Sequence, residues 1–293
     1  MAIPVRPEPE GCNVTTASGL RLHYHRMGEG HSTLFLHGGG PGSTGWTDFG
    51  QVANLFSRDR ACILLDLLQY GRSDKPPIEG PMWTFHARTY AAVLDELGIE
   101  QADVICNSWG GSAGIALAAR HPERVRKLVV TGSMPVLHLP SGPLPDRGAR
   151  GRLARDRYYG GDGPSEAKMR ELIATLEWYD AEKIPAETVA MRYRQSIQPD
   201  EIAITTNPPL RGEPEDLSGD LRRLICPVLY CWGSHDGFLP PDYPLMLAAM
   251  TPAADVYVMA RASHHLQEER PEDYYRVVSA FLDATGPLEQ EAP

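Results

Sequence analysis

Ser108 stands in a sequence pattern typical of a reactive serine held at a sharp turn. The apolar run Asp103–Asn107 predicts a buried strand that leads directly into Ser108 and then into the helical pattern Gly110–Ala119. Small residues two positions before and after the serine, Cys106 and Gly110, leave room for a tight strand-to-helix turn. Such a turn presents the hydroxyl at a helix N-terminus, whose free N–H groups favour developing negative charge. Taken alone, the pentapeptide also fits a buried serine without a chemical role.

A glycine-rich loop follows an earlier predicted strand. The segment His37–Gly42 reads His-Gly-Gly-Gly-Pro-Gly and comes directly after the strand pattern Thr33–His37. Because glycine has no side chain, backbone N–H groups of this loop can approach a substrate carbonyl oxygen, as an oxyanion hole requires. A phosphate-binding loop is the alternative, but the segment lacks the Gly-Lys-Ser/Thr ending of a P-loop and the GxGxxG spacing.

An acid and two histidines follow the last two predicted strands. Asp236 lies in the loop after the seventh strand, and the adjacent His264 and His265 lie in the loop after the eighth. With Ser108, these residues give the chain order serine, aspartate, histidine, which is the order of the catalytic triad in α/β-hydrolases. Asp66 also ends a strand and is the competing acid, with support of the following turn as its alternative role. We take Asp236 as the triad acid.

The candidate residues follow strands in an alternating strand–helix pattern. Six continuous apolar runs predict strands buried on both faces of a parallel sheet. These runs are Thr33–His37, Cys62–Asp66, Asp103–Asn107, Lys127–Thr131, Pro227–Trp232 and Val256–Met259. The helical patterns are Gly45–Phe56, Thr84–Leu97, Gly110–Ala119 and Glu272–Leu282. Two further runs, Asn13–Thr16 and Leu20–Tyr24, flank a turn and predict an antiparallel hairpin at the sheet edge.

This alternation stops after Ser133 and resumes near Leu221. The intervening segment shows no strand signal, and its helical patterns are Ser165–Trp178 and Ala186–Ile197. Residues 135–220 are therefore expected to form an inserted helical lid, or cap domain. Residues 1–134 and 221–293 are expected to form one α/β core domain with a mostly parallel eight-stranded sheet and helices on both faces.

Composition excludes several other classes of protein. The 293 residues carry a formal net charge of −10, which disfavours nucleic acid and anionic membranes as partners. Five cysteines without CxxC spacing predict reduced, buried thiols in a cytoplasmic protein. The N-terminus has no apolar core typical of a signal peptide, and the chain has no run long enough for a membrane span. We expect a small-molecule substrate and neither cofactor nor metal, and we leave a homo-oligomer open.

The same motifs resemble those of the α/β-hydrolase superfamily, over about Val14 to Leu282. More narrowly, the chain resembles the meta-cleavage product hydrolases, which cut carbon–carbon bonds in ring-opened aromatic compounds. The matching segments are His37–Gly42 with Trp46, Asn107-Ser108-x-Gly110-Gly111, the lid residues Tyr179, Asp180, Ile184, Glu187, Arg192 and Tyr193, and the loop from Trp232 to Pro240. The resemblance implies the α/β-hydrolase fold with a lid.

The resemblance also implies roles for individual residues around the serine. The superfamily pattern His-x-x-x-x-Glu-x-Pro selects His264 as the catalytic histidine and leaves His265 to line the pocket. The N–H groups of Gly39 or Gly40 and of Trp109 would hold the oxyanion.

Substrate binding is expected to involve Asn107, Arg192, His265 and Asp48. The carboxylate-binding lid arginine of the family falls on Arg192, although a solvated helix charge is the commoner role of a lone arginine. His265 departs from the family, which usually has an aromatic residue there, and Asp48 replaces a family asparagine. A carboxylate at Asp48 would repel an anionic substrate unless a neighbour neutralises it.

The residues and the resemblance together leave four functions open. The first is hydrolysis of a carbon–carbon bond in a 2-hydroxy-6-oxohexa-2,4-dienoate type of substrate by the serine triad. The second is a carboxylesterase or lactonase with the same triad, in which Arg192 would be dispensable. An aminopeptidase of the proline iminopeptidase kind is a third, disfavoured by the arginine-rich lid, and a non-hydrolytic ligand receptor is a fourth.

Overall fold

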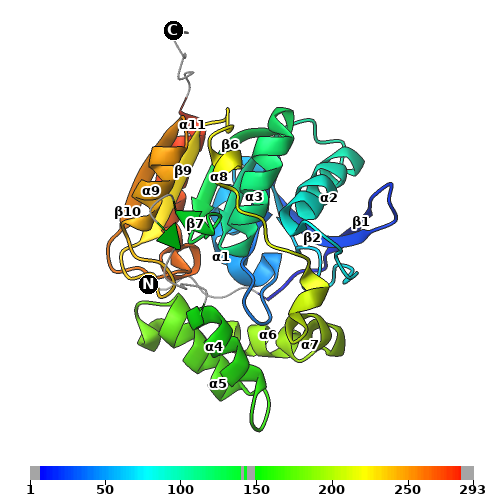
Figure 1. The fold of residues 1–293 in the computed structure, drawn as a ribbon, viewed down its shortest axis with the longest axis vertical. Coiled ribbons are helices and arrows are strands. Elements are labelled where there is room, and N and C mark those ends of the chain that lie inside the picture. The colour runs from blue at the N-terminus through cyan, green and yellow to red at the C-terminus, as the bar shows by residue number, and fades with distance from the viewer. Residues whose placement is uncertain (1–6, 140–141, 144–148, 285–293) are drawn as a thin grey trace.

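The computed structural model describes residues 7–139, 142–143 and 149–284, and it contains one large mixed sheet (Figure 1). The eight strands lie in the spatial order β1 (Cys12–Thr15), β2 (Arg21–Met27), β4 (Arg60–Leu65), β3 (His31–Leu36), β5 (Ala102–Asn107), β6 (Val125–Thr131), β9 (Val228–Gly233) and β10 (Ala254–Met259). The pairs β1–β2 and β2–β4 are antiparallel, and all others are parallel. The predicted hairpin and parallel sheet are therefore both present.

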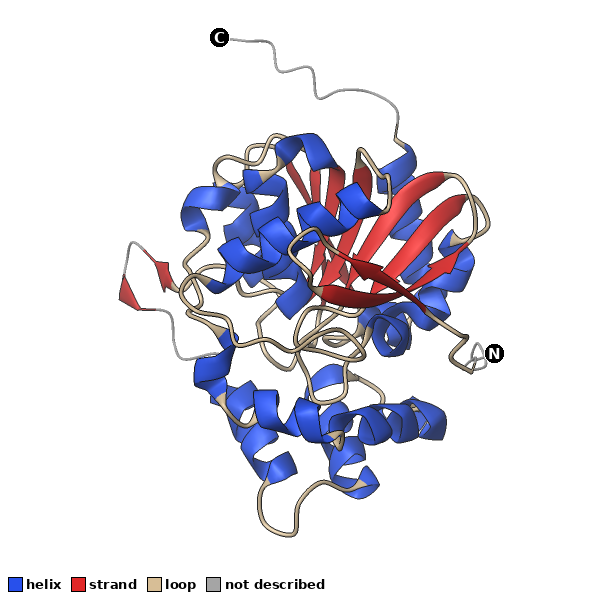
Figure 2. Ribbon diagram, turned by 90° about the vertical axis from the view of Figure 1, so that its right-hand side faces the viewer, coloured by secondary structure: helices blue, strands red, loops and turns tan. Residues whose placement is uncertain are grey.

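Helices cover both faces of this sheet (Figure 2). One apolar cluster packs β-strand side chains against α1 (Gly45–Phe56), α10 (Leu266–Glu269) and α11 (Pro271–Asp283). The other cluster packs the opposite face against α2 (Met82–Glu96), α3 (Trp109–Arg120), α8 (Ser218–Leu221) and α9 (Tyr243–Met250). All four helices predicted for the core are present with ends shifted by a few residues at most. The helix α9 was not predicted, because its sequence is apolar on every side and shows no amphipathic period.

The register of the central strands brings their carboxyl ends to one edge of the sheet. Leu36 pairs with both Leu65 and Cys106, and Asn107 pairs with Thr131. Loops that leave neighbouring parallel strands at the same level meet in space, and ligands of open α/β sheets bind at this edge. The loops that contain the predicted chemical groups all start here.

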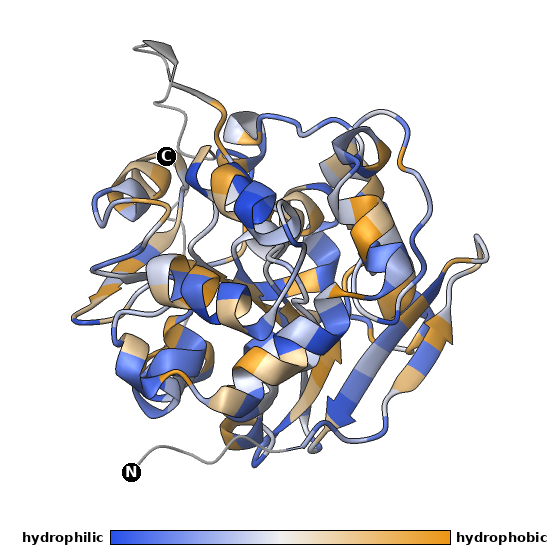
Figure 3. Ribbon diagram, turned by 90° about the horizontal axis from the view of Figure 1, so that it is seen from below, coloured by the Kyte–Doolittle hydropathy of each residue, from blue (hydrophilic) through white to orange (hydrophobic). Residues whose placement is uncertain are grey.

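A group of helices lies below this edge in Figure 1. It consists of α4 (Ala149–Tyr159), α5 (Glu166–Leu172), a π-helical turn (Ile173–Glu177), α6 (Ala186–Ser196) and α7 (Pro199–Thr205). These helices share an apolar cluster of their own, which includes Tyr158, Met169 and Trp178. Figure 3, which views the molecule from below, shows both hydrophilic and hydrophobic residues on these helices. This arrangement agrees with an inserted helical lid, whose exact boundaries at residues 135 and 220 stay a prediction.

Two features of the lid segment differ from the sequence expectation. The structure contains a short antiparallel pair, β7 (His138–Leu139) and β8 (Gly142–Pro143), where no strand was predicted. Strands of two residues are too short to give a periodic signal. The arginine-rich stretch Ala149–Tyr159 forms α4, which was not predicted. Among its described side chains only Tyr158 is buried, so the sequence shows no apolar stripe typical of a helix. No helix among the described residues is long and apolar enough to cross a membrane.

Candidate active site

Ser108 occupies a strained turn between β5 and α3. Its φ is 51° and its ψ is −112°, a conformation that non-glycine residues rarely adopt. Two backbone hydrogen bonds hold the turn, from Ser108 N to Thr131 O (2.7 Å) and from Gly110 N to His37 O (3.0 Å). The serine is partly exposed at the helix N-terminus. Strain that neighbouring strands enforce in this way is typical of a functional position.

Cys106 takes the place of the first small residue of this turn, and α3 makes room for it. A Cβ atom at Gly114 would lie 2.4 Å from the Cys106 Sγ. Any larger residue at position 114 would therefore collide with the thiol. The thiol is fully buried, and desolvation raises its pKa well above the ordinary value, so it stays protonated and inert.

His264 and Asp236 form a hydrogen-bonded pair beside this turn. The His264 Nδ1 lies 2.8 Å from Asp236 Oδ2, and both side chains are buried. The other oxygen of Asp236 accepts hydrogen bonds from the backbone N–H groups of Phe238 and Leu239, at 2.8 and 2.9 Å. Gly132, at φ +59°, leaves space for the imidazole, since a Cβ there would lie 2.5 Å from its Cε1. The carboxylate is thus fixed in place to orient the ring.

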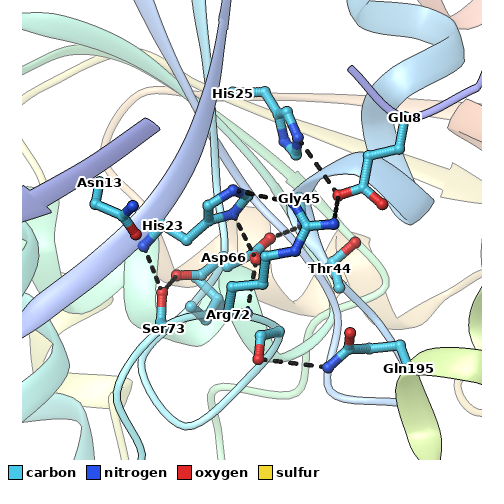
Figure 4. Close-up of polar contacts among 12 residues, drawn as sticks. Glu8, Asn13, His23, His25, Thr44, Gly45, Asp66, Arg72, Ser73 and Gln195 are labelled. Atoms are coloured by element: carbon cyan, nitrogen blue, oxygen red, sulfur yellow. Dashed lines mark hydrogen bonds and ion pairs between the residues drawn. The ribbon is translucent and has the colours of Figure 1, made fainter. Parts of the chain in front are cut away.

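Asp66, the competing acid, has a different environment (Figure 4). Its carboxylate pairs with His23 Nδ1 at 2.9 Å and accepts hydrogen bonds from Gly45 N and Arg72 N, each at 3.0 Å. Burial opposes its ionisation, but these donors outweigh burial and lower the pKa of Asp66. Asp66 therefore holds the start of α1 and the loop after β4, as its alternative role predicted.

The glycine loop lies against the residue that follows Ser108. A Cβ at Gly39 would lie 2.9 Å from the Tyr70 hydroxyl and 3.0 Å from Trp109 Cβ, so a larger residue would require these side chains to shift. Gly39 and Gly40 are partly exposed. The N–H of Gly38 is engaged elsewhere, because it donates to Asp48 Oδ2 at 2.8 Å. The predicted oxyanion donors are thus close together, and Asp48 anchors the base of their loop.

Arg192 is part of a buried charged cluster, which we define as Asp48, Glu177, Arg192, His265 and Glu268. Its guanidinium forms two parallel hydrogen bonds to Glu177, with Nη1–Oε2 at 3.1 Å and Nη2–Oε1 at 3.2 Å. Its Nε donates to Pro41 O at 2.8 Å. The two side chains are 1% and 3% exposed. The fork that was expected to bind a substrate carboxylate is therefore occupied by a carboxylate of the lid.

His265 completes the buried charged cluster. Its Nδ1 is hydrogen-bonded to Glu268 Oε1, and its backbone N donates to Glu177 O at 2.9 Å. Burial disfavours the imidazolium, but the carboxylates of Glu177 and Glu268 outweigh burial and raise the pKa of His265 to about 9. Burial likewise opposes ionisation of Glu177, but Arg192 and His265 lower its pKa to about 2. Burial raises the pKa of Glu268 to about 7. The cluster therefore holds the cations Arg192 and His265 beside the anion Glu177 at neutral pH.

Sequence reasoning missed Glu177 and Glu268, because a charged residue in a helical pattern normally predicts a solvated face. It placed Asn107 at the site, and in the structure the Asn107 Nδ2 donates to the His264 carbonyl at 3.1 Å. Asp48, His265 and Glu268 have ligand atoms within 4.8 Å of one another, the spacing of a metal site. The atoms of His265 and Asp48 are already engaged in the hydrogen bonds given above, and Arg192 lies beside them. We therefore assign the cluster no metal.

Comparison with known proteins identifies the family to which the chain belongs. The family model described as alpha/beta hydrolase fold matches residues 33–271. The chain is 35% identical over 284 residues to a 2-hydroxymuconate semialdehyde hydrolase of Pseudomonas putida, with 94% of this chain and 95% of the relative covered. It is 33% identical over 279 residues to a 2-hydroxy-6-oxononadienedioate/2-hydroxy-6-oxononatrienedioate hydrolase of Burkholderia vietnamiensis, with 92% and 93% covered.

A solved structure shares the fold over nearly its whole length. The 2-hydroxy-6-oxo-6-phenylhexa-2,4-dienoate hydrolase of a Rhodococcus species superposes with a TM-score of 0.79 at 24% identity, covering 94% of this chain and 99% of that one. The chain belongs to the α/β-hydrolase family and is a hydrolase that acts on a small molecule. Within that family its relatives are meta-cleavage product hydrolases.

Proposed function

We propose that the enzyme hydrolyses a carbon–carbon bond in a ring-opened aromatic compound of the 2-hydroxy-6-oxohexa-2,4-dienoate type. The observation that carries this proposal is the 35% identity, over nearly the full length of both chains, to an enzyme named 2-hydroxymuconate semialdehyde hydrolase. The hydrogen-bonded His264–Asp236 pair beside the Ser108 turn supplies the acid–base chemistry that such cleavage needs.

The reaction starts with movement of a proton. His264, oriented by Asp236, transfers the dienol proton so that the substrate takes its keto form. The Ser108 hydroxyl then passes its proton to His264 and attacks the distal carbonyl, forming a tetrahedral oxyanion that the N–H groups of Gly39 or Gly40 and of Trp109 stabilise. When the carbon–carbon bond breaks, its electron pair passes to the conjugated fragment, and His264 returns a proton to that carbon. The distal carbonyl remains as an ester of Ser108, and water hydrolyses this ester, which releases a carboxylic acid and restores the serine hydroxyl.

A carboxylesterase or lactonase is the second candidate function. The Glu177–Arg192 ion pair favours it, because an ester substrate needs no free arginine as a carboxylate anchor. The Ser108, His264 and Asp236 set would perform acyl transfer on an ester with the same oxyanion donors.

Spectrophotometry separates these two functions. Incubation with 2-hydroxymuconate semialdehyde should bleach the visible absorbance of the dienolate, and Ser108→Ala should abolish this bleaching. Hydrolysis of p-nitrophenyl esters without any cleavage of ring-opened dienoates would identify the enzyme as an esterase. Cytoplasmic location and a homo-oligomer stay predictions that this assay does not address.

A further inference from the structure

Tyr70, in the loop after β4, links the lid segment to the glycine loop. Its side chain is buried, with 1% of the residue exposed. The hydroxyl accepts a hydrogen bond from Arg211 Nη1 at 2.7 Å and donates to Gly39 O, which is 3.5 Å away. Arg211 ends the 3-10 turn Pro208–Arg211, within the segment expected to form the lid. One phenol group therefore stands between a cation of the lid and the loop that carries the proposed oxyanion donors.

The contact with Arg211 determines how the Tyr70 hydroxyl can donate. A guanidinium only donates hydrogen bonds, so the phenol oxygen accepts from it and keeps its own proton for another acceptor. Burial raises the pKa of Tyr70, so the hydroxyl retains this proton at neutral pH. The acceptor that it reaches is Gly39 O. The distance of 3.5 Å is long for such a bond, and hydrogen bonds of active sites often tighten when a substrate binds.

The carbonyl of Gly39 belongs to the same peptide group as the N–H of Gly40. In this trans peptide the two groups point in opposite directions, so a donor that holds the oxygen also fixes the direction of the N–H. The preceding peptide is held in the same way, because His37 Nδ1 donates to Gly38 O at 2.6 Å and thereby orients the N–H of Gly39. The rings of His37 and Tyr70 pack edge to face, with centroids 5.2 Å apart. These two side chains thus orient both candidate donors of the glycine loop.

Arg211 also lies against Trp109, the residue that supplies the other proposed oxyanion donor. The guanidinium carbon is 5.4 Å from the centre of the Trp109 ring and 5.0 Å from the centre of the Tyr70 ring, which are favourable distances for a cation over an aromatic face. Its Nη2 donates to Thr205 Oγ1 on the lid helix α7 at 3.3 Å. The guanidinium is therefore fastened to the lid and contacts a side chain beside each half of the proposed oxyanion hole.

We propose that Tyr70 and Arg211 are positioning residues through which the lid holds the oxyanion hole in its active geometry. Tyr70 orients the N–H of Gly40 through the carbonyl of Gly39, and Arg211 orients Tyr70 from the lid. The proposal rests on the oxyanion role of the glycine loop in the proposed function, but not on which bond of the substrate is cut. Preorganised donors act mainly on the transition state, so their loss lowers kcat more than it changes KM.

Tyr70→Phe tests this arrangement, because it removes the hydroxyl and keeps the ring. Activity is measured with 2-hydroxymuconate semialdehyde and with p-nitrophenyl butyrate, and all variants are compared on the substrate that the wild-type enzyme hydrolyses faster. We expect kcat to fall about 10-fold and KM to change less than about twofold, a smaller effect than the ~10²–10³-fold loss of a direct donor. Tyr230→Phe is the matched control, since its buried hydroxyl bonds to Thr251 Oγ1 at 2.8 Å in the core. It should lower Tm without lowering kcat.

A double-mutant cycle tests whether Arg211 acts through Tyr70. Arg211→Gln alone should also lower kcat about 10-fold. The double variant Tyr70→Phe/Arg211→Gln should lose about 10–20-fold, rather than the ~100-fold expected of two independent effects. Arg194→Gln removes an exposed arginine of α6 that pairs with Glu187, and it should leave kcat unchanged. Thermal unfolding of each variant reports whether it is folded at the assay temperature, and the Arg211 variants decide the test if Tyr70→Phe is not.

A trifluoromethyl ketone reports on the oxyanion hole directly. With 1,1,1-trifluoroheptan-2-one, the Ser108 oxygen adds to the carbonyl carbon, the serine proton passes to His264, and the carbonyl oxygen becomes the oxyanion of a stable hemiketal. Its inhibition constant should rise about 10-fold in Tyr70→Phe and in Arg211→Gln, but not in Tyr230→Phe. Heptan-2-one binds without forming this adduct, so its affinity should be the same in all variants.

Three outcomes would overturn the proposal. Unchanged kcat and ketone inhibition in a folded Tyr70→Phe enzyme would show that the hydroxyl only packs against Gly39. Multiplying losses in the double variant would show that Arg211 does not act through Tyr70. A wild-type enzyme that the trifluoromethyl ketone inhibits no better than heptan-2-one would reject the oxyanion hole itself, and the proposed mechanism with it. Ester hydrolysis without semialdehyde cleavage would instead reject only the carbon–carbon function, and the ester kinetics would then decide the role of Tyr70 and Arg211.

Discussion

Glu177 and Arg192 meet in a buried bidentate ion pair that joins the end of the π-helical turn to α6 and lies against the glycine loop. A Cβ at Gly40 would lie 2.7 Å from Arg192 Nη2 and 3.1 Å from Glu177 Oε1. The pair therefore connects two parts of the lid and also supports the loop that carries the proposed oxyanion donors.

Glu177→Gln should destabilise the fold strongly, because it leaves the Arg192 charge buried without its partner. We expect a loss of about 3–5 kcal/mol in the free energy of unfolding, measured by urea denaturation. Adding Arg192→Met should cost less than the sum of the two single changes. Glu187→Gln is the control, since its pair with Arg194 is exposed and worth at most about 1 kcal/mol. Equal effects of Glu177→Gln and Glu187→Gln would show that the buried pair adds no stability.

Ser108→Ala should remove catalysis and leave the fold intact. Ser108→Ala removes the nucleophilic hydroxyl. We therefore expect kcat to fall about 10⁴-fold or more on the substrate that the wild-type enzyme cleaves fastest. Ser112→Ala is the matched control in α3, where the hydroxyl is hydrogen-bonded to the Ser133 hydroxyl at 3.0 Å. That variant should keep activity within several-fold of wild type. Comparable turnover in both variants would reject Ser108 as the nucleophile.

Asp236→Asn and Asp66→Asn should separate catalysis from stability. Asp236→Asn loses the carboxylate that orients His264 and supports its charge, so kcat should drop about 10³–10⁴-fold with little change in Tm. Asp66→Asn should lower Tm, because the carboxylate bonded to His23 and two backbone N–H groups is lost. The folded Asp66→Asn enzyme should keep most of its kcat. The reverse pattern would make Asp66 the triad acid.

The fold and the Ser108, Asp236 and His264 set could be predicted because their signals are local. Buried parallel strands are continuous apolar runs. The turn at Ser108 requires small residues on both sides of the serine, and this pattern can be recognised within the five residues 106–110. The Glu177–Arg192 pair could not be predicted, because its two partners are separated by a turn, a 3-10 segment and half of α6. Local patterns describe each of them only as a polar position on a helix. The contact depends on how the lid packs on the glycine loop. These segments lie far apart in the sequence, so a local sequence pattern does not show their packing.

His265 should remain protonated well above neutral pH. Its pKa of about 9 arises because Glu177 and Glu268 outweigh the cost of burying the imidazolium, and Asp48 acts in the same direction. An NMR titration of the imidazole, assigned with His265→Gln, should therefore show no midpoint near the ordinary value of about 6.5. Glu268→Gln, which removes the hydrogen bond to Nδ1, should shift the midpoint to lower pH.

The raised pKa of His265 also predicts that the free energy of unfolding decreases as the pH rises above neutral. A histidine whose pKa is higher in the folded state binds its proton more tightly there than in the unfolded chain. Its contribution is therefore complete below about pH 6.5 and is lost as the pH rises towards 9. A difference of this size corresponds to about 3 kcal/mol, and urea denaturation at both pH values should detect it. Unfolding free energies that rise across this interval, together with a His265 midpoint near 6.5, would show that the buried charged cluster does not hold an imidazolium.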